Sequence, residues 1–526
     1  MKITNWLESH RRLAMTCVLM GAALLRMQHL AQPYIDSYAW RESDTASIAT
    51  AFANGAWNIF LPQVRWGGPG PNHIGAEFQT VSYIAALGYR LVGAAPWVGR
   101  LVSVAFGLWG IFALYKLVRR VWGTSSGIAA AAVMAVLPGS VFIERSFLSD
   151  GAMTALMTTS LWLLVEFRQT GSVLALTAAT VTGMLGCLTK LPGAVLVMPA
   201  IYVVTTIPKL QLGERRTIIQ LSTAAFGVIL PVLAYYLWAR HVALSAPPYH
   251  FTGEGKFVWS SGLFEWIRND YYLPKFWQIV SQEHWGPLFI SFALIGALVR
   301  PGSDQFVTVP WLFHAWLAAL LIRYLLEAQH LVTDPYNIHL FNPVIAAFSG
   351  QALVRLATGV AQPRYQSARA TLASILLATA AVAGHFQVRA LYSDAYRDHY
   401  VLARLVATLS RPEELVISMG LEPVLLYHSE RNGWVFPPEE IGTMSLGSQQ
   451  PTRDYGSHDV AILHALKARG AQWLAIPSWN SYAGASAEQS LRSDYPSLYA
   501  GLLAEFEVVR EIPEGLILRA KPVDPT

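Results

Sequence analysis

Charged residues are scarce in this chain of 526 residues, since Asp, Glu, Lys and Arg together make up 13% of it. A soluble globular protein carries roughly 25%. Hydrophobic residues make up 53%, and 18 Trp and 22 Tyr are present. Amphipathic rings are favoured where helices pass the lipid headgroups. The composition therefore excludes an ordinary soluble protein and indicates that lipid surrounds most of the chain.

Cysteine and clustered basic residues are also scarce. Cys17 and Cys187 both lie in apolar runs, which excludes a disulfide framework. The formal charge is +5, but the cations stand singly or in pairs between apolar segments, so we expect no nucleic-acid partner. The sequence contains no Walker loop, dinucleotide fingerprint, zinc-protease motif, paired cysteine motif or nucleophile elbow.

Long apolar runs dominate the rest of the chain. A membrane span needs roughly 20 mostly apolar residues. About eleven segments meet this need, with the first read as a retained anchor because it holds Arg26 and lacks a convincing cleavage site. The predicted spans are 13–30, 98–118, 124–143, 152–168, 172–188, 190–208, 217–240, 285–300, 306–326, 337–357 and 370–391.

Basic turns predict the orientation, because short cytoplasmic loops are enriched in Lys and Arg. If the N-terminus is cytoplasmic, every basic turn lies on the cytoplasmic side, provided that the short run 79–93 does not cross the membrane. We expect this run to lie along or dip into the outer surface of the membrane. These turns hold Arg119, Arg120, Arg168, Lys209, Arg215, Arg216, Arg300, Arg355, Arg364 and Arg369. We expect a multi-pass protein of the bacterial inner membrane.

This orientation puts three larger segments outside the cell membrane. They are the first loop 31–97, the loop 241–284 and the tail 393–526, which follows a transmembrane domain of residues 1–392. The tail has strand-like runs at 415–419, 424–427, 473–476, 506–512 and 516–519, and a helical stretch at 459–469. The sequence therefore predicts a polytopic α-helical membrane protein with a C-terminal extracytoplasmic α/β domain.

Ionisable residues gather at the predicted outer face, where such groups indicate function by default. In the first loop, Glu42 and Asp44 precede or open a helix that we expect to run from Asp44. Capping carboxylates on a solvated surface helix are an equally good interpretation. Further along this loop, His73 and Glu77 flank the start of the run 79–93.

Three more clusters face the same side. Glu144 to Asp150 joins two spans, and Asp150 could simply cap the next helix. Lys190 stands where two short spans meet, and its alternative interpretation is an ammonium that reaches the interface by snorkelling. The segment from Arg323 to Tyr336 contains His330, whose alternative is a solvated loop histidine.

The layout limits the substrates. All large segments are outside, where nucleotide sugars and ATP are not normally present, and the inner loops are too short for a nucleotide-binding domain. An energised substrate would have to arrive through the lipid.

Several segments together resemble the C-type (GT-C) polyprenyl-phosphate-dependent glycosyltransferases, especially lipid A aminoarabinose transferase and the protein O-mannosyltransferases. The resemblance covers the chain to about residue 208, the segment around Tyr336 and the tail. The order and spacing of the matching segments along the chain are more specific than any single segment. The pieces are Arg41–Ala46, Gly75–Gln79, Leu91–Gly93, Gly99–Leu101, Arg145–Asp150, Leu188–Lys190 and Tyr336–Pro343.

The resemblance implies an inverting transfer of a sugar from a polyprenyl-phosphate donor to an extracytoplasmic acceptor. In the family the first-loop acids read Asp-Glu, whereas Arg41 and Glu42 occupy those positions here. We therefore assign the general base to Asp44 or Glu42, with Asp150 as a further catalytic acid. The implied substrate- and phosphate-binding residues are Arg65, His73, Glu77, Arg145, Lys190, Arg323, His330 and Tyr336.

No cofactor is required for this chemistry, although Glu42, Asp44, His73 and Glu77 are also ligand types for a divalent cation. The acceptor stays open among lipid A, an envelope glycan, a lipid-linked intermediate and a protein hydroxyl. Two other functions remain, a transporter or flippase for a lipid-linked sugar and a non-catalytic membrane scaffold. Transporters commonly have matching, broken-helix halves, and we find no convincing internal symmetry.

Overall fold

The computed structural model describes residues 8–208, 214–252, 269–299, 308–359, 365–420, 422–436, 457–477, 493 and 496–522. The predicted turn residues Lys209, Arg300 and Arg364 lie outside them. The chain divides into two compact units. The helical unit contains Met1–Leu30, Gly99–Tyr236 and Gly255–Tyr392, and the mixed unit contains Ala31–Val98, Leu237–Glu254 and Ser393–Thr526.

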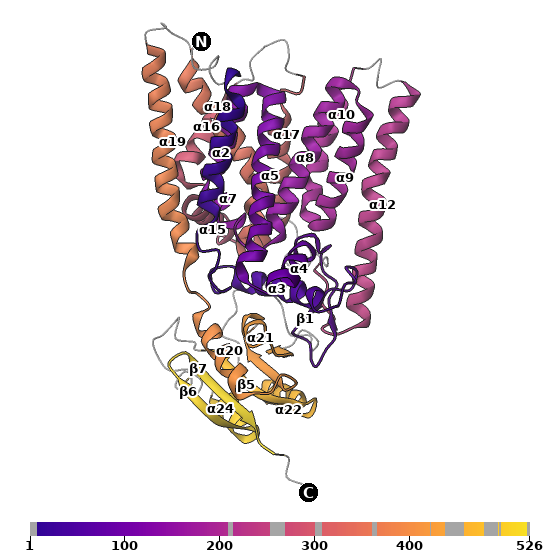
Figure 1. Ribbon diagram of the computed structural model, residues 1–526, viewed down its shortest axis with the longest axis vertical. Coiled ribbons are helices and arrows are strands. Elements are labelled where there is room, and N and C mark those ends of the chain that lie inside the picture. The colour runs from indigo at the N-terminus through magenta and orange to yellow at the C-terminus, as the bar shows by residue number, and fades with distance from the viewer. Residues whose placement is uncertain are drawn as a thin grey trace. The chain divides into compact units, whose positions relative to one another are not determined.

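The helical unit is built from long helices joined by short turns (Figure 1). Two of them, α5 and α12, continue into the mixed unit at one end. The elements are α2 (Arg11–Arg26), α5 (Pro96–Trp122), α6 (Thr124–Val136), α7 (Pro138–Ile143), α8 (Ser149–Thr170), α9 (Val173–Thr189), η1 (Leu191–Leu196), α10 (Val197–Thr205), α12 (Arg215–Ser245), α15 (Tyr272–Ile279), η2 (Val280–His284), α16 (Gly286–Leu298), α17 (Leu312–Thr333), η3 (Pro335–Phe341), α18 (Asn342–Thr358), α19 (Gln366–Arg389) and η5 (Ala390–Tyr392).

Each predicted span overlaps at least one of these helices. Some of the spans are divided between two helices. The run 124–143 breaks before Pro138, because proline lacks a backbone donor and favours the first turn of a new helix. Within the described ranges, five helical segments are long and apolar enough to cross a membrane: Pro96–Trp122, Arg215–Ser245, Leu312–Thr333, Pro335–Thr358 and Gln366–Leu409. The count of eleven crossings stays a prediction.

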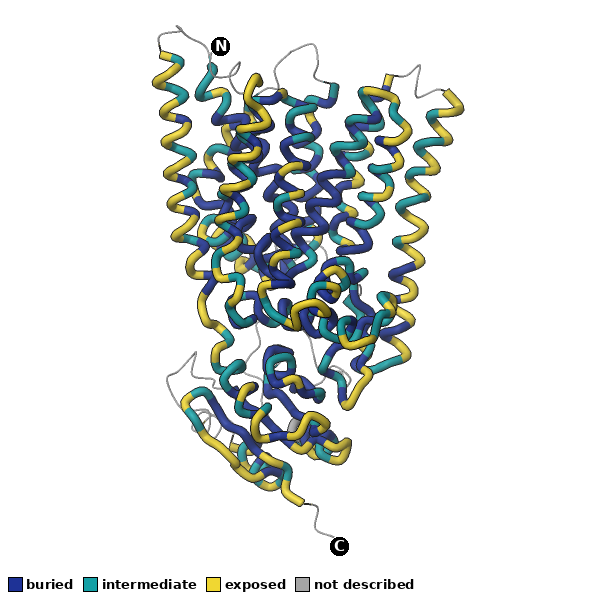
Figure 2. Tube along the Cα trace, viewed as in Figure 1, coloured by how far each residue is buried: buried dark blue, intermediate teal, exposed yellow. Residues whose placement is uncertain are grey.

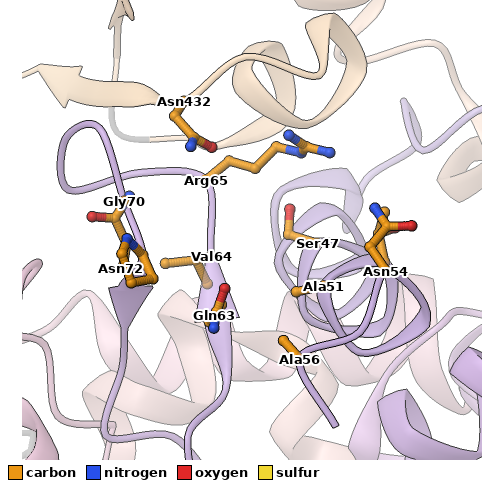
Figure 3. Close-up of a pocket in the computed structure, with 12 residues that line it drawn as sticks. Ser47, Ala51, Asn54, Ala56, Gln63, Val64, Arg65, Gly70, Asn72 and Asn432 are labelled. Carbon is orange, nitrogen blue, oxygen red and sulfur yellow. The ribbon is translucent and has the colours of Figure 1, made fainter. Parts of the chain in front are cut away.

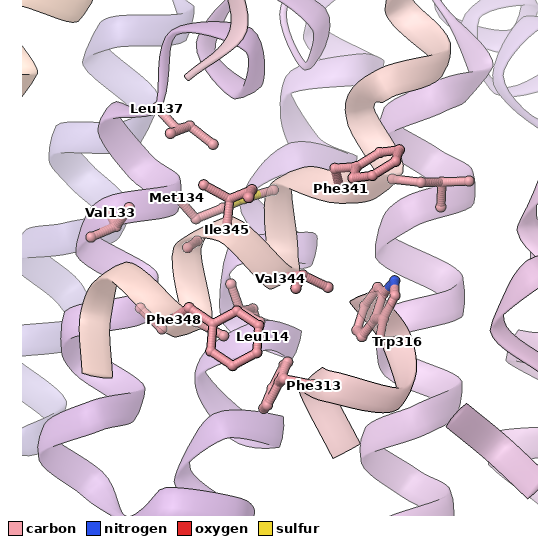
Figure 4. Close-up of a cluster of buried hydrophobic side chains, with 14 of the residues drawn as sticks. Leu114, Val133, Met134, Leu137, Phe313, Trp316, Phe341, Val344, Ile345 and Phe348 are labelled. Carbon is pink, nitrogen blue, oxygen red and sulfur yellow. The ribbon is translucent and has the colours of Figure 1, made fainter. Parts of the chain in front are cut away.

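A large apolar core holds the helical unit together (Figure 4). Side chains from α5, α6, α17 and α18 meet in this core, among them Leu114, Met134, Phe313, Trp316 and Phe348. Small residues let the backbones approach closely. A β-carbon on Gly350 of α18 would stand 2.5 Å from the backbone nitrogen of Ala130 in α6. This close approach is typical of helix packing in membranes, where small residues line the contact.

Other helix faces of this unit are apolar and yet exposed. Figure 2 shows α12 and α19 with long exposed stretches, whereas the central helices are mostly buried. Phe226, Leu230 and Leu233 of α12 are among the exposed large side chains. Apolar surface of this extent is unfavourable in water, and lipid is its normal environment in a membrane helix.

Basic side chains gather at one end of the helical unit. Arg120 at the end of α5 pairs with Glu166 of α8 at 3.0 Å, and Arg168 donates to the carbonyl of Thr206 at 2.7 Å. Arg369 of α19 donates to the carbonyl of Leu356 at 2.8 Å. The predicted basic turns that the structure describes here thus close helix ends on a single side.

The mixed unit combines the first loop with the tail. Its sheet has the strand order β4-β3-β5-β7-β6, in which β3 pairs in parallel with β4 and β5, and β7 pairs antiparallel with β5 and β6. The elements are α3 (Ala39–Ala53), β1 (Gln63–Val64), β2 (Asn72–His73), α4 (Thr80–Val92), α20 (Arg397–Leu409), β3 (Leu415–Met419), α21 (Val424–Ser429), β4 (Gly433–Phe436), α22 (Ser457–Ala468), β5 (Ala471–Pro477), α24 (Pro496–Glu505), β6 (Phe506–Ile512) and β7 (Gly515–Ala520).

One predicted strand is wrong. The run 424–427 forms the helix α21, because a short apolar run bounded by turns does not distinguish a buried helix from a strand. The other four predicted strands and the helix near 459–469 coincide with β3, β5, β6, β7 and α22. The division of the chain into domains at residue 393 stays a prediction.

The glycine-rich stretch after β1 attaches the first loop to the edge strand β4. The amides of Gly67 and Gly68 both donate to the carbonyl of Gly433 at 2.8 Å, and the Gly433 amide donates to the carbonyl of Arg65 at 3.0 Å. Gly67 and Gly68 have φ of 116° and 126°, which residues with a side chain rarely adopt. The glycines therefore let a loop cover an otherwise unpaired sheet edge.

Candidate functional site

The first-loop acids lie inside a helix and are buried. Helix α3 begins at Ala39 rather than at Asp44, so Glu42 falls in its first turn and Asp44 follows in the next. Glu42 is 0% exposed and Asp44 is 7% exposed. Tyr38 occupies the N-cap position, and its side chain makes no capping hydrogen bond. The interpretation of these acids as caps on a solvated helix is therefore wrong.

Asp44 is held by a tryptophan from the loop after β1. The indole Nε1 of Trp66 donates to Asp44 Oδ1 at 2.8 Å. Burial raises the pKa of Asp44, while Arg41, the Trp66 hydrogen bond and His250 lower it by a smaller amount. A carboxylate with a raised pKa is a stronger base than a solvated one, which suits general-base catalysis.

Arg41 and Glu77 form an ion pair beside Asp44. Their closest atoms, Arg41 Nη2 and Glu77 Oε1, are 2.7 Å apart. Glu77 is thus the counter-ion of Arg41. The negative charge of Glu77 also raises the pKa of Asp44 slightly. The charge of Glu42 is one of the smaller causes that raise the pKa of Tyr427, after burial.

His73 and Arg65 stand on the β1–β2 hairpin of the same unit. His73 pairs across the hairpin with Gln63, and its Nδ1 is buried without a hydrogen-bond partner among the described residues. The Nε of Arg65 is also buried and has no hydrogen-bond partner among the described residues. Burial lowers the pKa of Arg65, and the charge of Glu430 opposes that effect. In the part of the chain that the structure describes, no group of three His, Cys, Asp or Glu is placed to hold a metal ion.

In the helical unit, Asp150 and Lys190 form a buried ion pair. Lys190 Nζ lies 2.7 and 2.9 Å from the two oxygens of Asp150 and 4.5 Å from the ring centre of Tyr336. Asp150 is 1% exposed and Lys190 is 4% exposed. Lys190 therefore does not snorkel. Asp150 lies in the first turn of α8, but Leu148 is the N-cap residue and no side-chain cap bond is present.

The segment from Arg323 to Asn337 continues this cluster from Tyr336. Arg323 donates to Glu327 at 3.1 Å and to the carbonyl of Asn337 at 3.1 Å, while its Nη2 is buried without a hydrogen-bond partner in the described structure. His330 lies within 3.0 Å of the Asn337 amide and 3.5 Å of Glu327. His330 is thus built into a polar network and is not a freely solvated histidine.

Arg145 contacts a further set of groups in the helical unit. It donates to the carbonyls of Gln28 and His29 and stands 4.9 Å from the ring centre of Tyr392, and it is fully buried. Because backbone carbonyls take its donors, Arg145 is the least suited of the predicted cations to meet a phosphate.

A second buried ion pair escaped the sequence reasoning. Arg26 of α2 contacts Glu144 at 2.7 Å, and His339 approaches the other Glu144 oxygen at 3.4 Å. Arg26 also donates to the carbonyls of Ala22 and Ala135. The available signal was that Arg26 and Glu144 are opposite charges in or next to apolar runs, where an unpaired charge is costly.

The predicted site residues thus form two groups. Glu42, Asp44, Arg65, His73 and Glu77 belong to the mixed unit. The helical unit holds Asp150, Lys190, Tyr336, Arg323 and His330 as one polar cluster, with Arg145 on its own partners.

The chain has the fold of the C-type glycosyltransferases, and it is an integral membrane protein. Residues 80–235 match the family model described as dolichyl-phosphate-mannose-protein mannosyltransferase. No curated protein matches the chain. These findings, with the solved structures below, confirm the resemblance that the sequence motifs indicate.

Three solved structures share the fold. Cupriavidus metallidurans ArnT bound to undecaprenyl phosphate has 16% identity and a TM-score of 0.57, with 99% of this chain and 100% of ArnT covered. The Archaeoglobus fulgidus oligosaccharyltransferase tethered to an acceptor peptide has 12% identity and a TM-score of 0.59, covering 98% and 75%. The mycobacterial arabinofuranosyltransferase AftD has 16% identity and a TM-score of 0.55, covering 99% and 42%.

Proposed function

We propose that this protein transfers a sugar, with inversion, from a polyprenyl-phosphate donor to an extracytoplasmic acceptor. The observation that carries the proposal is Asp44, a buried carboxylate with a raised pKa on the first-loop helix of a C-type glycosyltransferase fold. The structures of two fold neighbours support the donor class, since ArnT binds undecaprenyl phosphate and an archaeal oligosaccharyltransferase binds dolichol-phosphate.

In the proposed reaction, Asp44 accepts the proton of an acceptor hydroxyl while the hydroxyl oxygen bonds to the anomeric carbon of the donor sugar. The bond from that carbon to the phosphate oxygen breaks, and its electron pair leaves on polyprenyl phosphate. A positioned base typically contributes ~10²–10⁴-fold to such a rate. The Asp44 carboxylate is oriented for this role by Trp66.

The leaving phosphate needs a cation, and fixed charge of this kind is commonly the larger catalytic contribution. Arg323 suits the role best, because its buried Nη2 has no partner in the described structure while Glu327 and the Asn337 carbonyl orient the rest of the guanidinium. Lys190 already neutralises Asp150, so we assign this pair, with Tyr336, to positioning the donor. The reaction uses these side chains and requires no cofactor.

The same proposal assigns the protein to the bacterial inner membrane, with about eleven crossings, a cytoplasmic N-terminus and an extracytoplasmic domain at 393–526. The gathering of Arg120, Arg168 and Arg369 at one end of the helical unit supports this orientation.

Release of polyprenyl phosphate tests the proposed function. We expect the purified full-length protein, given a polyprenyl-phosphate sugar and acceptor extract, to release polyprenyl phosphate, and Asp44→Asn to reduce this rate at least 100-fold. The matched control is Glu413→Gln, which neutralises a 67% exposed carboxylate of the same unit and should leave the rate unchanged.

A transporter or a scaffold would release no polyprenyl phosphate in this assay. Full turnover in each of Asp44→Asn, Glu42→Gln and Asp150→Asn would show that the catalytic assignment is wrong. The Asp44→Asn protein must keep its elution profile and unfold at a temperature no lower than that of the unmodified protein, so that loss of rate is not loss of fold.

A further inference from the structure

The mixed unit, which holds Asp44, also contains a polar pocket. Its volume is about 230 Å³, and it is lined by α3, by the β1–β2 hairpin and by Asn432 just before β4. Figure 3 shows side chains of α3 facing those of the hairpin across the pocket, with Arg65 and Asn432 at the same end. Ser47 of the lining lies one helical turn after Asp44, and Arg65 precedes Trp66, which holds the Asp44 carboxylate.

The lining of the pocket offers hydrogen-bonding groups. Asn72 uses its amide nitrogen on the carbonyl of Gly68 at 3.1 Å, and Asn432 uses its own on the carbonyl of Pro69 at 2.9 Å. Each residue also carries a carboxamide oxygen, which is an acceptor of the kind that a ligand hydroxyl needs. Carboxamides that donate and accept side by side suit the hydroxyl groups of a sugar.

The charge in the pocket has one sign. Arg65 contributes a guanidinium whose Nε is buried and has no hydrogen-bond partner in the described structure, and none of the described residues that line the pocket is acidic. A buried donor without a partner is costly, and guanidinium groups are matched by phosphate or carboxylate oxygens. An anion bound in the pocket would balance the charge of this guanidinium.

The size restricts the ligand further. Pockets for drug-sized ligands usually measure roughly 300–1,000 Å³, so this pocket suits a smaller group such as a single sugar ring. Most of the named lining side chains are polar, which disfavours a prenyl chain.

We propose that this pocket binds the acceptor, and that the acceptor is a carbohydrate carrying an anionic substituent, with its hydroxyls on the carboxamides and its anion on Arg65. The inference rests on the proposed function, because it treats Asp44 as the base that the acceptor hydroxyl must reach. A sugar in this pocket lies beside the helix turn that carries Asp44, whereas a lipid-linked donor is expected to enter from the membrane. The pocket therefore decides acceptor choice.

Binding measurements on the full-length protein in nanodiscs test the inference without turnover. The probes are glucose 6-phosphate, glucose, inorganic phosphate and a serine-containing peptide, measured by saturation-transfer NMR. We expect the sugar phosphate to bind at least tenfold more tightly than either glucose or phosphate alone. Arg65→Gln should remove that advantage and leave the weak binding of glucose, whereas Arg65→Lys should restore part of it.

Asn72→Ala should weaken the binding of both glucose and glucose 6-phosphate, because it removes a carboxamide that contacts a hydroxyl group present in both. The matched control is Arg411→Gln, which removes a 72% exposed arginine of the same unit and should change nothing. Equal affinity for glucose and its phosphate, peptide binding alone, or no loss in Arg65→Gln would overturn the inference.

The two proposals fail in different ways. If the protein releases polyprenyl phosphate in an Asp44-dependent manner but the sugar phosphate has no advantage, the acceptor assignment is wrong and the transferase stands. If the sugar phosphate binds through Arg65 but no polyprenyl phosphate is ever released, the binding site stands and its role as an acceptor site is wrong.

Discussion

The proposed catalytic role of Asp44 comes with a cost to stability. Burial raises its pKa above the ordinary value of 3.8, so the folded protein holds a proton there at pH values where the unfolded chain has released it. Stability contributed by this group is therefore present at low pH and is lost as pH rises through the raised pKa. Burial of this carboxylate therefore does not stabilise the folded protein at neutral pH, as the proposed role of a general base allows.

Asp44→Asn should therefore inactivate the enzyme and stabilise it at neutral pH. The Asn oxygen can still accept the Trp66 hydrogen bond, and the buried charge is gone. We expect a higher Tm than in the unmodified protein at pH 7, with the difference vanishing below about pH 3.8. Thermal unfolding followed by intrinsic fluorescence across this pH range measures it. A lower Tm at pH 7 would contradict the prediction.

The Asp150–Lys190 pair should behave differently, because each partner neutralises the other. Removing one partner of a buried ion pair typically costs about 3–5 kcal/mol, whereas replacing both by neutral groups is often tolerated. We expect Asp150→Asn to lower stability strongly and Asp150→Asn with Lys190→Met to recover most of it. A double-mutant cycle in denaturant gives the coupling, and additive effects would contradict the pairing.

At the scale of elements, the position of a helix was easier to predict than its first residue. The apolar runs locate the helices because each run needs a bilayer or a core around it. The predicted start of α3 was wrong because the polar residues Glu42 and Asp44 suggested an exposed helix end, whereas the structure buries both within the first two turns. Tertiary contacts overrode the local pattern there.

Close packing between α6 and α18 provides a test at this scale. Gly350→Leu would force a side chain into the Ala130 backbone, and such overpacking typically costs about 1–3 kcal/mol or more. The control is Gly21→Ala in α2, where an added β-carbon meets nothing within 4 Å and helix propensity improves by up to ~1 kcal/mol. Thermal stability in detergent distinguishes them, and a neutral Gly350→Leu would contradict the packing.

At the scale of the whole molecule, the open question with the clearest test is topology. About eleven crossings and an inside N-terminus require that a reporter fused after residue 400 scores as extracytoplasmic and one inserted at 360–364 as cytoplasmic. Paired alkaline phosphatase and green fluorescent protein fusions measure this. A cytoplasmic signal after residue 400 would mean that the number of crossings is wrong by an odd number.

Composition and apolar runs alone determined that this is a membrane protein, where its helices lie and which residues gather near helix ends. These features are local, because a span requires consecutive apolar residues and a basic turn requires nearby cations. Only the tertiary structure decided which distant polar groups meet. Three examples join segments that are separated along the chain: the hydrogen bond from Trp66 to Asp44, the ion pair of Arg26 with Glu144, and the pocket that Arg65 and Asn432 line together. Such pairings depend on how helices and strands pack, and no sequence periodicity encodes them.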